Sequence, residues 1–238
     1  LKPGTRAVSY PQTPEVRAVL HEICAQRGIP LTEVDAAAIA PLTDGVDGQT
    51  FTYRGAEYTL PLLGAHQLRN AAVALETVAA LRARGWRIPD AAVRAGLAQV
   101  RWPARFELLR RAPWFVLDGG HNPQCIEALV QNIDDYLKGR ELTILTGVLG
   151  DKDFHCMYKN VAPYAKEFIT ITPANPRAMS AEGLADYLRQ FGKPVTACDV
   201  VEDGVRLAIE HAGETGVVLC YGSLYMIGDI DAALKKLS

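Results

Sequence analysis

The sequence WFVLDGGHNP at residues 114–123 decides the fold of this chain. Its first four residues are apolar, as expected of a strand buried in a sheet. The two glycines permit a sharp turn and a close approach of the backbone. Asn122 is suited to cap a helix, and Pro123 is suited to the first helical position. The stretch therefore predicts a strand that leads through a tight turn into a helix.

The same alternation of short apolar stretches and helical patterns continues to the end of the chain. It predicts strands at 114–117, 142–145, 168–171, 195–198 and 217–220, and helices at 123–137, 154–161, 181–190, 201–211 and 224–237. Short, continuous apolar strands separated by helices are typical of a parallel sheet that is covered on both faces. The expected class is α/β, with a mostly parallel sheet and helices on both of its faces.

The first hundred residues are less regular. They predict a short strand at 6–9, a helix from the capping residue Thr13 to near Gly28 that presents an apolar face, a β-hairpin at 51–60 that turns at Arg54 and Gly55, and helices at 67–84 and 89–97. A boundary falls near residues 101–105, where the strict alternation begins. We therefore expect two domains, at 1–100 and 101–238.

Composition narrows the classes of function. The chain has 238 residues, of which 49% are hydrophobic and 22% charged, so a large core is available and disorder is not expected. The formal net charge of −2 argues against a surface for nucleic acid or for a membrane. No apolar run approaches the roughly 18 residues that span a bilayer. The five cysteines, an odd number without C-x-x-C spacing, favour reduced thiols in a cytoplasmic enzyme over disulfides or a metal site.

The turn at 118–123 is the best candidate site, because ligands of open α/β sheets gather at the carboxyl ends of the strands. Asp118 offers a carboxylate that can accept hydrogen bonds from ribose hydroxyls. The following helix points the positive end of its dipole at this place, and His121 can donate to a carboxylate or phosphate there. The alternative is an ordinary strand–turn–helix corner with a capping asparagine.

Three further residues are candidates on their chemistry. Ser223 follows the strand at 217–220 and could hold an anion, although serine is also a common helix cap. Asn70 carries the donor and acceptor needed to read an adenine edge. Arg105 lies at the domain boundary, and its fork-shaped guanidinium suits a phosphate. The chain lacks a P-loop, a dinucleotide fingerprint and metal-ligand spacing, so the residues alone predict a nucleotide- or anion-binding α/β domain.

Eight short motifs, taken in order, are more specific than any one of them. Together they resemble the folylpolyglutamate synthase and dihydrofolate synthase family within the Mur ligase superfamily, and the likeness covers essentially the whole chain. The motifs are KPG at 2–4, SYPQ at 9–12, LGAHQLRNAA at 63–72, WPARFE at 102–107, LDGGHNP at 117–123, GVLGDKD at 147–153, NPRA at 175–178 and GSLY at 222–225.

The resemblance implies an ATP-dependent ligase that joins L-glutamate to the γ-carboxylate of a folate through an acyl phosphate, with ATP and Mg²⁺ as cofactors. Residues 1–100 would be the tail of a central ATPase domain, and 101–238 a Rossmann-like C-terminal domain. Asn70 matches the residue that contacts adenine, Arg105 the one that reaches the terminal phosphate of ATP, and Asp118 one near the nucleotide. His121 and Ser223 match positions that hold the incoming glutamate.

The family usually has alanine where this chain has Gly120, a change expected to loosen the turn without abolishing the site. The chain also opens at Leu1 rather than at a methionine. The family's phosphate loop, magnesium ligands and carbamylated lysine are expected to lie before this point. The fragment alone is therefore expected to be inactive and to hold no metal.

The expected parent enzyme is monomeric and acts on ATP, a folate or dihydropteroate, and L-glutamate, without a nucleic-acid or membrane partner. Two alternatives stay open. The chain could be a binding or regulatory module that kept the Rossmann-like domain without catalysis. It could also be a nucleotide-dependent oxidoreductase, although the missing dinucleotide fingerprint counts against that function.

Overall fold

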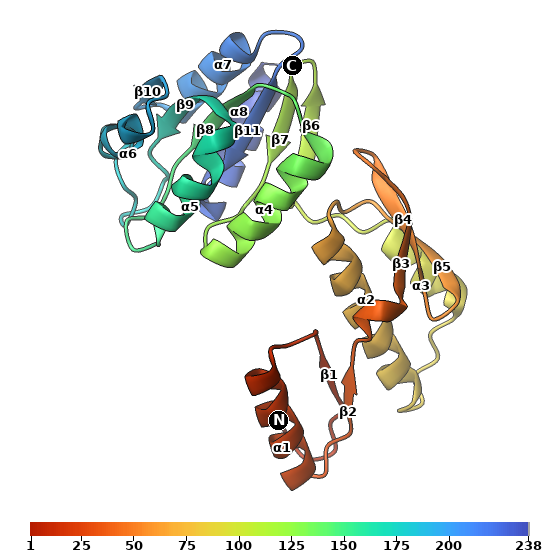
Figure 1. Ribbon diagram of the computed structural model, residues 1–238. Helices are drawn as coiled ribbons and strands as arrows, with labels where there is room; N and C mark the ends of the chain where they lie inside the picture. Colours follow the sequence, from red (N-terminus) through yellow and green to blue (C-terminus); the bar gives the residue numbers. More distant parts are fainter. Residues whose placement is uncertain (238) are drawn as a thin grey trace. The chain divides into compact units, whose positions relative to one another are not determined.

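The computed structural model describes residues 1–237, and the chain divides into two compact units, Leu1–Arg101 and Trp102–Ser238 (Figure 1). Each unit has its own sheets and its own buried cluster of hydrophobic side chains. In the described residues, no helix is long and apolar enough to cross a membrane.

The second unit is built on a six-stranded sheet in the described part of the chain. Its strands are β6 (Glu107–Arg111), β7 (Trp114–Leu117), β8 (Leu142–Thr146), β9 (Ala165–Ile171), β10 (Val195–Cys198) and β11 (Val217–Tyr221). They lie in the order β10-β9-β8-β11-β7-β6, and every neighbouring pair is parallel except β6 with β7. The expected α/β class with a mostly parallel sheet is confirmed.

Helices cover both faces of this sheet, as predicted (Figure 1). They are α4 (Pro123–Tyr136), α5 (Phe154–Val161), α6 (Ala181–Leu188), α7 (Val201–Ala212) and α8 (Ile227–Lys236). Apolar residues of α7 and α8 pack with alternate residues of the central strands, such as Leu145, Ile169 and Val218. On the other face, α4 packs against α5, and Tyr158 of α5 lies against the ring of Tyr221. Strands that are apolar on both faces therefore form the centre of the unit.

The first unit has two small sheets. Strand β1 (Ala7–Ser9) pairs in parallel with β2 (Leu31–Glu33) across α1 (Pro14–Gln26). Strands β3 (Ile39–Gly45), β4 (Gly48–Tyr53) and β5 (Ala56–Leu60) form an antiparallel sheet, and α2 (Ala65–Arg82) and α3 (Asp90–Ala98) complete the unit. The predicted hairpin is confirmed, because Arg54 and Gly55 both have the positive φ angles, 48° and 77°, that a tight hairpin turn requires.

Some local expectations were wrong. Thr13 precedes α1, but its side chain makes no capping hydrogen bond. Strands β2, β3 and β6 were not predicted; β3 is largely exposed, so its residues show no alternation of polar and apolar side chains. The last predicted helix begins as a 3₁₀ turn, Leu224–Met226, before α8 starts at Ile227.

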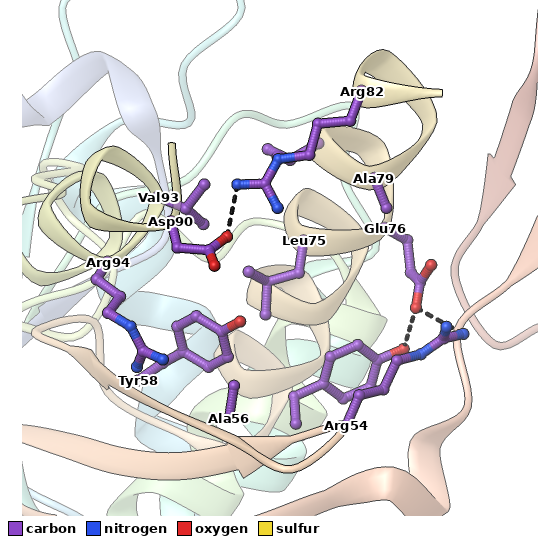
Figure 2. Close-up of a pocket in the computed structure, with 12 residues that line it drawn as sticks. Arg54, Ala56, Tyr58, Leu75, Glu76, Ala79, Arg82, Asp90, Val93 and Arg94 are labelled. Atoms are coloured by element: carbon purple, nitrogen blue, oxygen red, sulfur yellow. Dashed lines mark hydrogen bonds and ion pairs between the residues drawn. The ribbon is translucent and has the colours of Figure 1, made fainter. Parts of the chain in front are cut away.

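A cavity of about 190 Å³ lies between the hairpin, α2 and α3 of the first unit (Figure 2). Glu76 is buried beside it and accepts a hydrogen bond from the Tyr53 hydroxyl at 2.7 Å, and an ion pair joins the same carboxylate oxygen to Arg54 at 2.8 Å. Arg82 pairs with Asp90 at 2.7 Å and so joins α2 to α3. These contacts hold the hairpin and the two helices together.

Candidate functional site

The turn after β7 has the predicted geometry. The Asn122 side chain accepts a hydrogen bond from the Cys125 backbone N–H at 2.9 Å, and Pro123 is the first residue of α4. The turn therefore caps the helix and also leaves Asp118, the residues after it and the helix N-terminus at the carboxyl edge of the sheet.

Asp118 is half-buried, and both of its carboxylate oxygens accept backbone hydrogen bonds. Oδ1 accepts from the Gly120 N–H at 2.6 Å, and Oδ2 accepts from the Phe106 N–H at 2.9 Å. Burial raises the pKa of Asp118, while the two N–H groups and the charges of Arg105 and His121 offset part of the rise. The residue thus joins the turn after β7 to the segment that precedes β6.

Arg105 lies beside the same turn. Its Nη1 donates to the Ala104 carbonyl at 3.4 Å, and the Gly119 N–H donates to that carbonyl at 2.8 Å. A Cβ atom on Gly119 would lie 3.2 Å from Arg105 Nη1 and would collide with the Leu224 side chain. The glycine at this position is therefore required for the arginine and the turn after β11 to approach closely.

His121 and Ser223 line one cavity of about 210 Å³. They meet there because each follows one of two strands, β7 and β11, that are neighbours in the sheet (Figure 1). The Nδ1 atom of His121 is 2.8 Å from the Gly119 carbonyl, which can only accept, so Nδ1 carries the proton. In the neutral ring, Nε2 is then the acceptor. Ser223 is 3% exposed, and its Oγ accepts from the Tyr225 N–H at 3.3 Å. The predicted cap at Ser223 is confirmed, and its hydroxyl also lies at the cavity.

Gly222 lines this cavity directly after β11 and lies close against the end of β8. Its φ is +122°, and a Cβ atom there would lie 2.5 Å from the Gly147 carbonyl oxygen and 2.9 Å from Thr146 Oγ1. No side chain can be accommodated between β11 and the end of β8 without moving the backbone. The position therefore requires glycine.

Two cationic residues of the cavity were not predicted as site residues. Lys152 follows β8, and Arg177 follows β9 and pairs with Asp151 at 2.7 Å. Their position in the sequence could have identified them, because both belong to loops that follow the carboxyl ends of strands. Lys152 and Arg177 thus place two cationic side chains at the cavity, which suits an anionic ligand.

Asn70 belongs to the first unit and lies on an exposed part of α2, where its Nδ2 donates to Gln67 Oε1 at 3.0 Å. Gln67 is buried and so orients the amide of Asn70. The structure thus brings Arg105, Asp118, His121 and Ser223 together in the second unit and places Asn70 in the first.

Comparison with known proteins decides the family. Residues 104–224, about half of the chain, match the family described as Mur ligase, glutamate ligase domain. The chain belongs to the Mur ligase family. The matched Mur ligase region begins at Ala104, at the segment that carries Arg105, and ends at Leu224 beside Ser223. The resemblance inferred from the motifs is confirmed.

The relatives of this Mur ligase chain are folate enzymes. It is 26% identical to the dihydrofolate synthase/folylpolyglutamate synthase of Bacillus subtilis over 99% of the chain and 56% of that protein. It is 34% identical to the folylpolyglutamate synthase of Lacticaseibacillus casei over 57% of the chain and 33% of that protein.

Among solved structures, the Mycobacterium tuberculosis folylpolyglutamate synthase complexed with ADP matches with a TM-score of 0.81 and 30% identity. The match covers 96% of this chain and 56% of that chain. The Mur ligase chain thus spans about half the length, or less, of the relatives it matches.

Proposed function

We propose that this chain is the C-terminal portion of an ATP-dependent ligase that adds L-glutamate to the γ-carboxylate of a folate through an acyl phosphate. The observation that carries the proposal is the cavity of His121 and Ser223, with Lys152 and Arg177 on its wall, at the carboxyl edge of the sheet. It occurs in a chain of the Mur ligase family whose relatives carry the names of such ligases.

The cavity suits an amino-acid substrate by charge and size. Glutamate carries two carboxylates, and Lys152 and Arg177 can neutralise them, Lys152 as a point charge and Arg177 through its fork of N–H donors. The Ser223 hydroxyl can donate to a carboxylate oxygen. His121, with Nδ1–H bound to Gly119, can accept a proton at Nε2 from the ammonium group, which must become a neutral amine before it attacks.

Arg105 and Asp118 are the proposed contacts for ATP in this unit. The hydrogen bond to Ala104 uses one of the five N–H donors of Arg105, and a guanidinium can also bind a terminal phosphate and balance the charge of the transferred group. Each oxygen of Asp118 has a second lone pair for a ribose hydroxyl. The solved relative complexed with ADP supports a nucleotide as ligand.

We extend the proposal to the first unit. Residues 1–100 are assigned to the tail of the central ATPase domain, with Asn70 at the adenine base. The exposed Val16 and Val19, at 45% and 52% exposure, support the presence of a covering surface in a larger domain. The described residues contain no group of three or more side chains that could together hold a metal ion.

In the proposed reaction, an oxygen of the folate γ-carboxylate attacks the γ-phosphorus of ATP, and ADP leaves. The neutral amine of glutamate then attacks the acyl carbon, the amide bond forms and inorganic phosphate leaves. Residues of this chain would bind and orient the two substrates, and most of the rate enhancement would come from that positioning and from charge neutralisation.

Calorimetric titration with L-glutamate and with ATP tests this function directly. We expect Ser223→Ala to weaken glutamate binding by about two- to tenfold, the effect of one lost hydrogen bond. Ser180→Ala is the matched control, because Ser180 caps α6 through a hydrogen bond from Gly183 and does not line the cavity. Equal glutamate affinity in both variants would contradict the assignment of the cavity.

A further inference from the structure

The two residues that flank Arg105 have a left-handed backbone. Ala104 has a φ of 55° and Phe106 a φ of 49°, and neither is a glycine. A Cβ atom makes this conformation unfavourable, so it persists only where the surrounding structure holds it. Two such residues on either side of Arg105 indicate that contacts with the surrounding structure hold the backbone of this segment in place.

Two carboxylates hold the segment, one on each side of the arginine. Glu107 Oε2 accepts a hydrogen bond from the Ala104 N–H at 2.9 Å, and Asp118 Oδ2 accepts one from the Phe106 N–H at 2.9 Å. Ala104 is fully buried and Phe106 is 2% exposed, with its ring 5.7 Å from the ring of Tyr136 on α4. The peptide before Ala104 and the peptide after Arg105 are thereby tied down, and the Gly119 N–H holds the peptide between them through the Ala104 carbonyl.

The Glu107 side chain is not needed to hold its own strand. Glu107 is the first residue of β6, and its backbone is already paired with Leu117 of β7. The carboxylate instead reaches back three residues to Ala104. Ala104 in turn bears on the direction of Arg105, because Arg105 Nη1 donates to the Ala104 carbonyl and lies against Gly119.

We propose that Glu107 is a positioning residue that, together with Asp118, locks the left-handed residues around Arg105 and so fixes the direction of its guanidinium. This inference deepens the proposed function and rests on the role given there to Arg105 at the terminal phosphate of ATP. Glu107 itself contacts the Ala104 backbone and acts through Arg105.

The lock can be tested on the chain itself by NMR, without any ligand. In Glu107→Ala we expect the Ala104 amide to exchange about five- to tenfold faster, as for a lost hydrogen bond of ordinary strength, and the Arg105 Nε–H resonance to shift. Glu107→Gln should restore both signals, because its amide oxygen can accept the same hydrogen bond. Glu214→Ala, an exposed glutamate before β11, controls for the change of charge.

An unmoved Arg105 resonance in Glu107→Ala, with or without a lower melting temperature, would overturn the proposal and leave Glu107 a purely structural residue. A resonance that moves equally in Glu214→Ala would overturn it as well, because the cause would then be charge alone.

Tripolyphosphate binding, measured by calorimetry, separates this inference from the proposed function. We expect Arg105→Ala and Glu107→Ala each to weaken binding by about two- to tenfold, and the double variant to be no weaker than Arg105→Ala. Additive losses would contradict an action of Glu107 through Arg105. Unchanged binding in Arg105→Ala would remove the phosphate role, while the NMR experiment would still decide whether Glu107 positions the arginine.

Discussion

Replacement of Gly222 by alanine tests the geometry at the end of β11. The new Cβ would lie 2.5 Å from the Gly147 carbonyl oxygen and 2.9 Å from Thr146 Oγ1. Thr146 is not free to move, because it pairs with Tyr221 across β8 and β11 and its hydroxyl donates to the Tyr221 carbonyl at 2.8 Å. Gly147 is itself closely packed, since a Cβ atom on it would lie 2.5 Å from the Ile171 carbonyl oxygen. The φ of +122° adds backbone strain for any residue with a side chain.

The close contacts and the backbone strain together set the expected loss of folding free energy. Overpacking in a rigid site costs about 1–3 kcal/mol, and a side chain held in a sparsely populated backbone conformation costs about 1–3 kcal/mol more. The sum of about 2–6 kcal/mol is a large part of the 5–15 kcal/mol that typically stabilises a domain. For a unit of this size, at about 3–4 °C per kcal/mol, we expect the melting temperature to fall by roughly 6–24 °C.

Scanning calorimetry measures the melting temperatures of the wild type and of Gly222→Ala. Gly228→Ala is the matched control. Gly228 lies in α8, where an added Cβ meets nothing within 4 Å, so the same substitution should stabilise the helix by about 0.5–1 kcal/mol. The two glycine-to-alanine variants should thus move the melting temperature in opposite directions. A Gly222→Ala variant that melts within about 2 °C of the wild type would refute the reasoning.

Two further predictions concern the carboxylates of Glu76 and Asp118. Glu76→Ala should destabilise the first unit by about 2–3 kcal/mol, because the Tyr53 hydroxyl loses its acceptor; a change in urea-unfolding free energy below about 0.5 kcal/mol would contradict this. The raised pKa of Asp118 means that the folded protein retains a proton that the unfolded chain releases from about pH 4 upwards. The unfolding free energy of the wild type relative to Asp118→Asn should therefore fall as the pH rises above about 4, and a relative free energy that increases with pH would contradict this prediction.

The parallel sheet of the second unit could be predicted from the sequence because its signals are local. Residues 114–117 are apolar on both faces, and Asn122 and Pro123 mark the start of α4 within one turn of chain. Strand β6 could not be predicted in the same way. Its sequence ELLRR lacks a period of two, and a register shift between Leu108 and Arg110 in its pairing with β7 breaks the pattern further.

The sequence offered candidate site residues, but it did not predict the contacts that surround them. His121 and Ser223 were expected to be functional, and they line one cavity because β7 and β11 are neighbours in the sheet although about a hundred residues separate the two positions. The bonds from Phe106 to Asp118 and from Ala104 to Glu107 depend on positive φ angles at non-glycine residues. No sequence rule predicts those angles, because tertiary packing imposes them.

The most direct test of the account is an NMR titration of this chain with L-glutamate, up to its solubility limit. We predict shifts of the backbone amides of His121, Lys152 and residues 222–225, and a titration of the same amides in Ser223→Ala that needs about two- to tenfold more glutamate. Shifts confined to other parts of the sheet, or none at all, would contradict the claim that this cavity receives the amino acid.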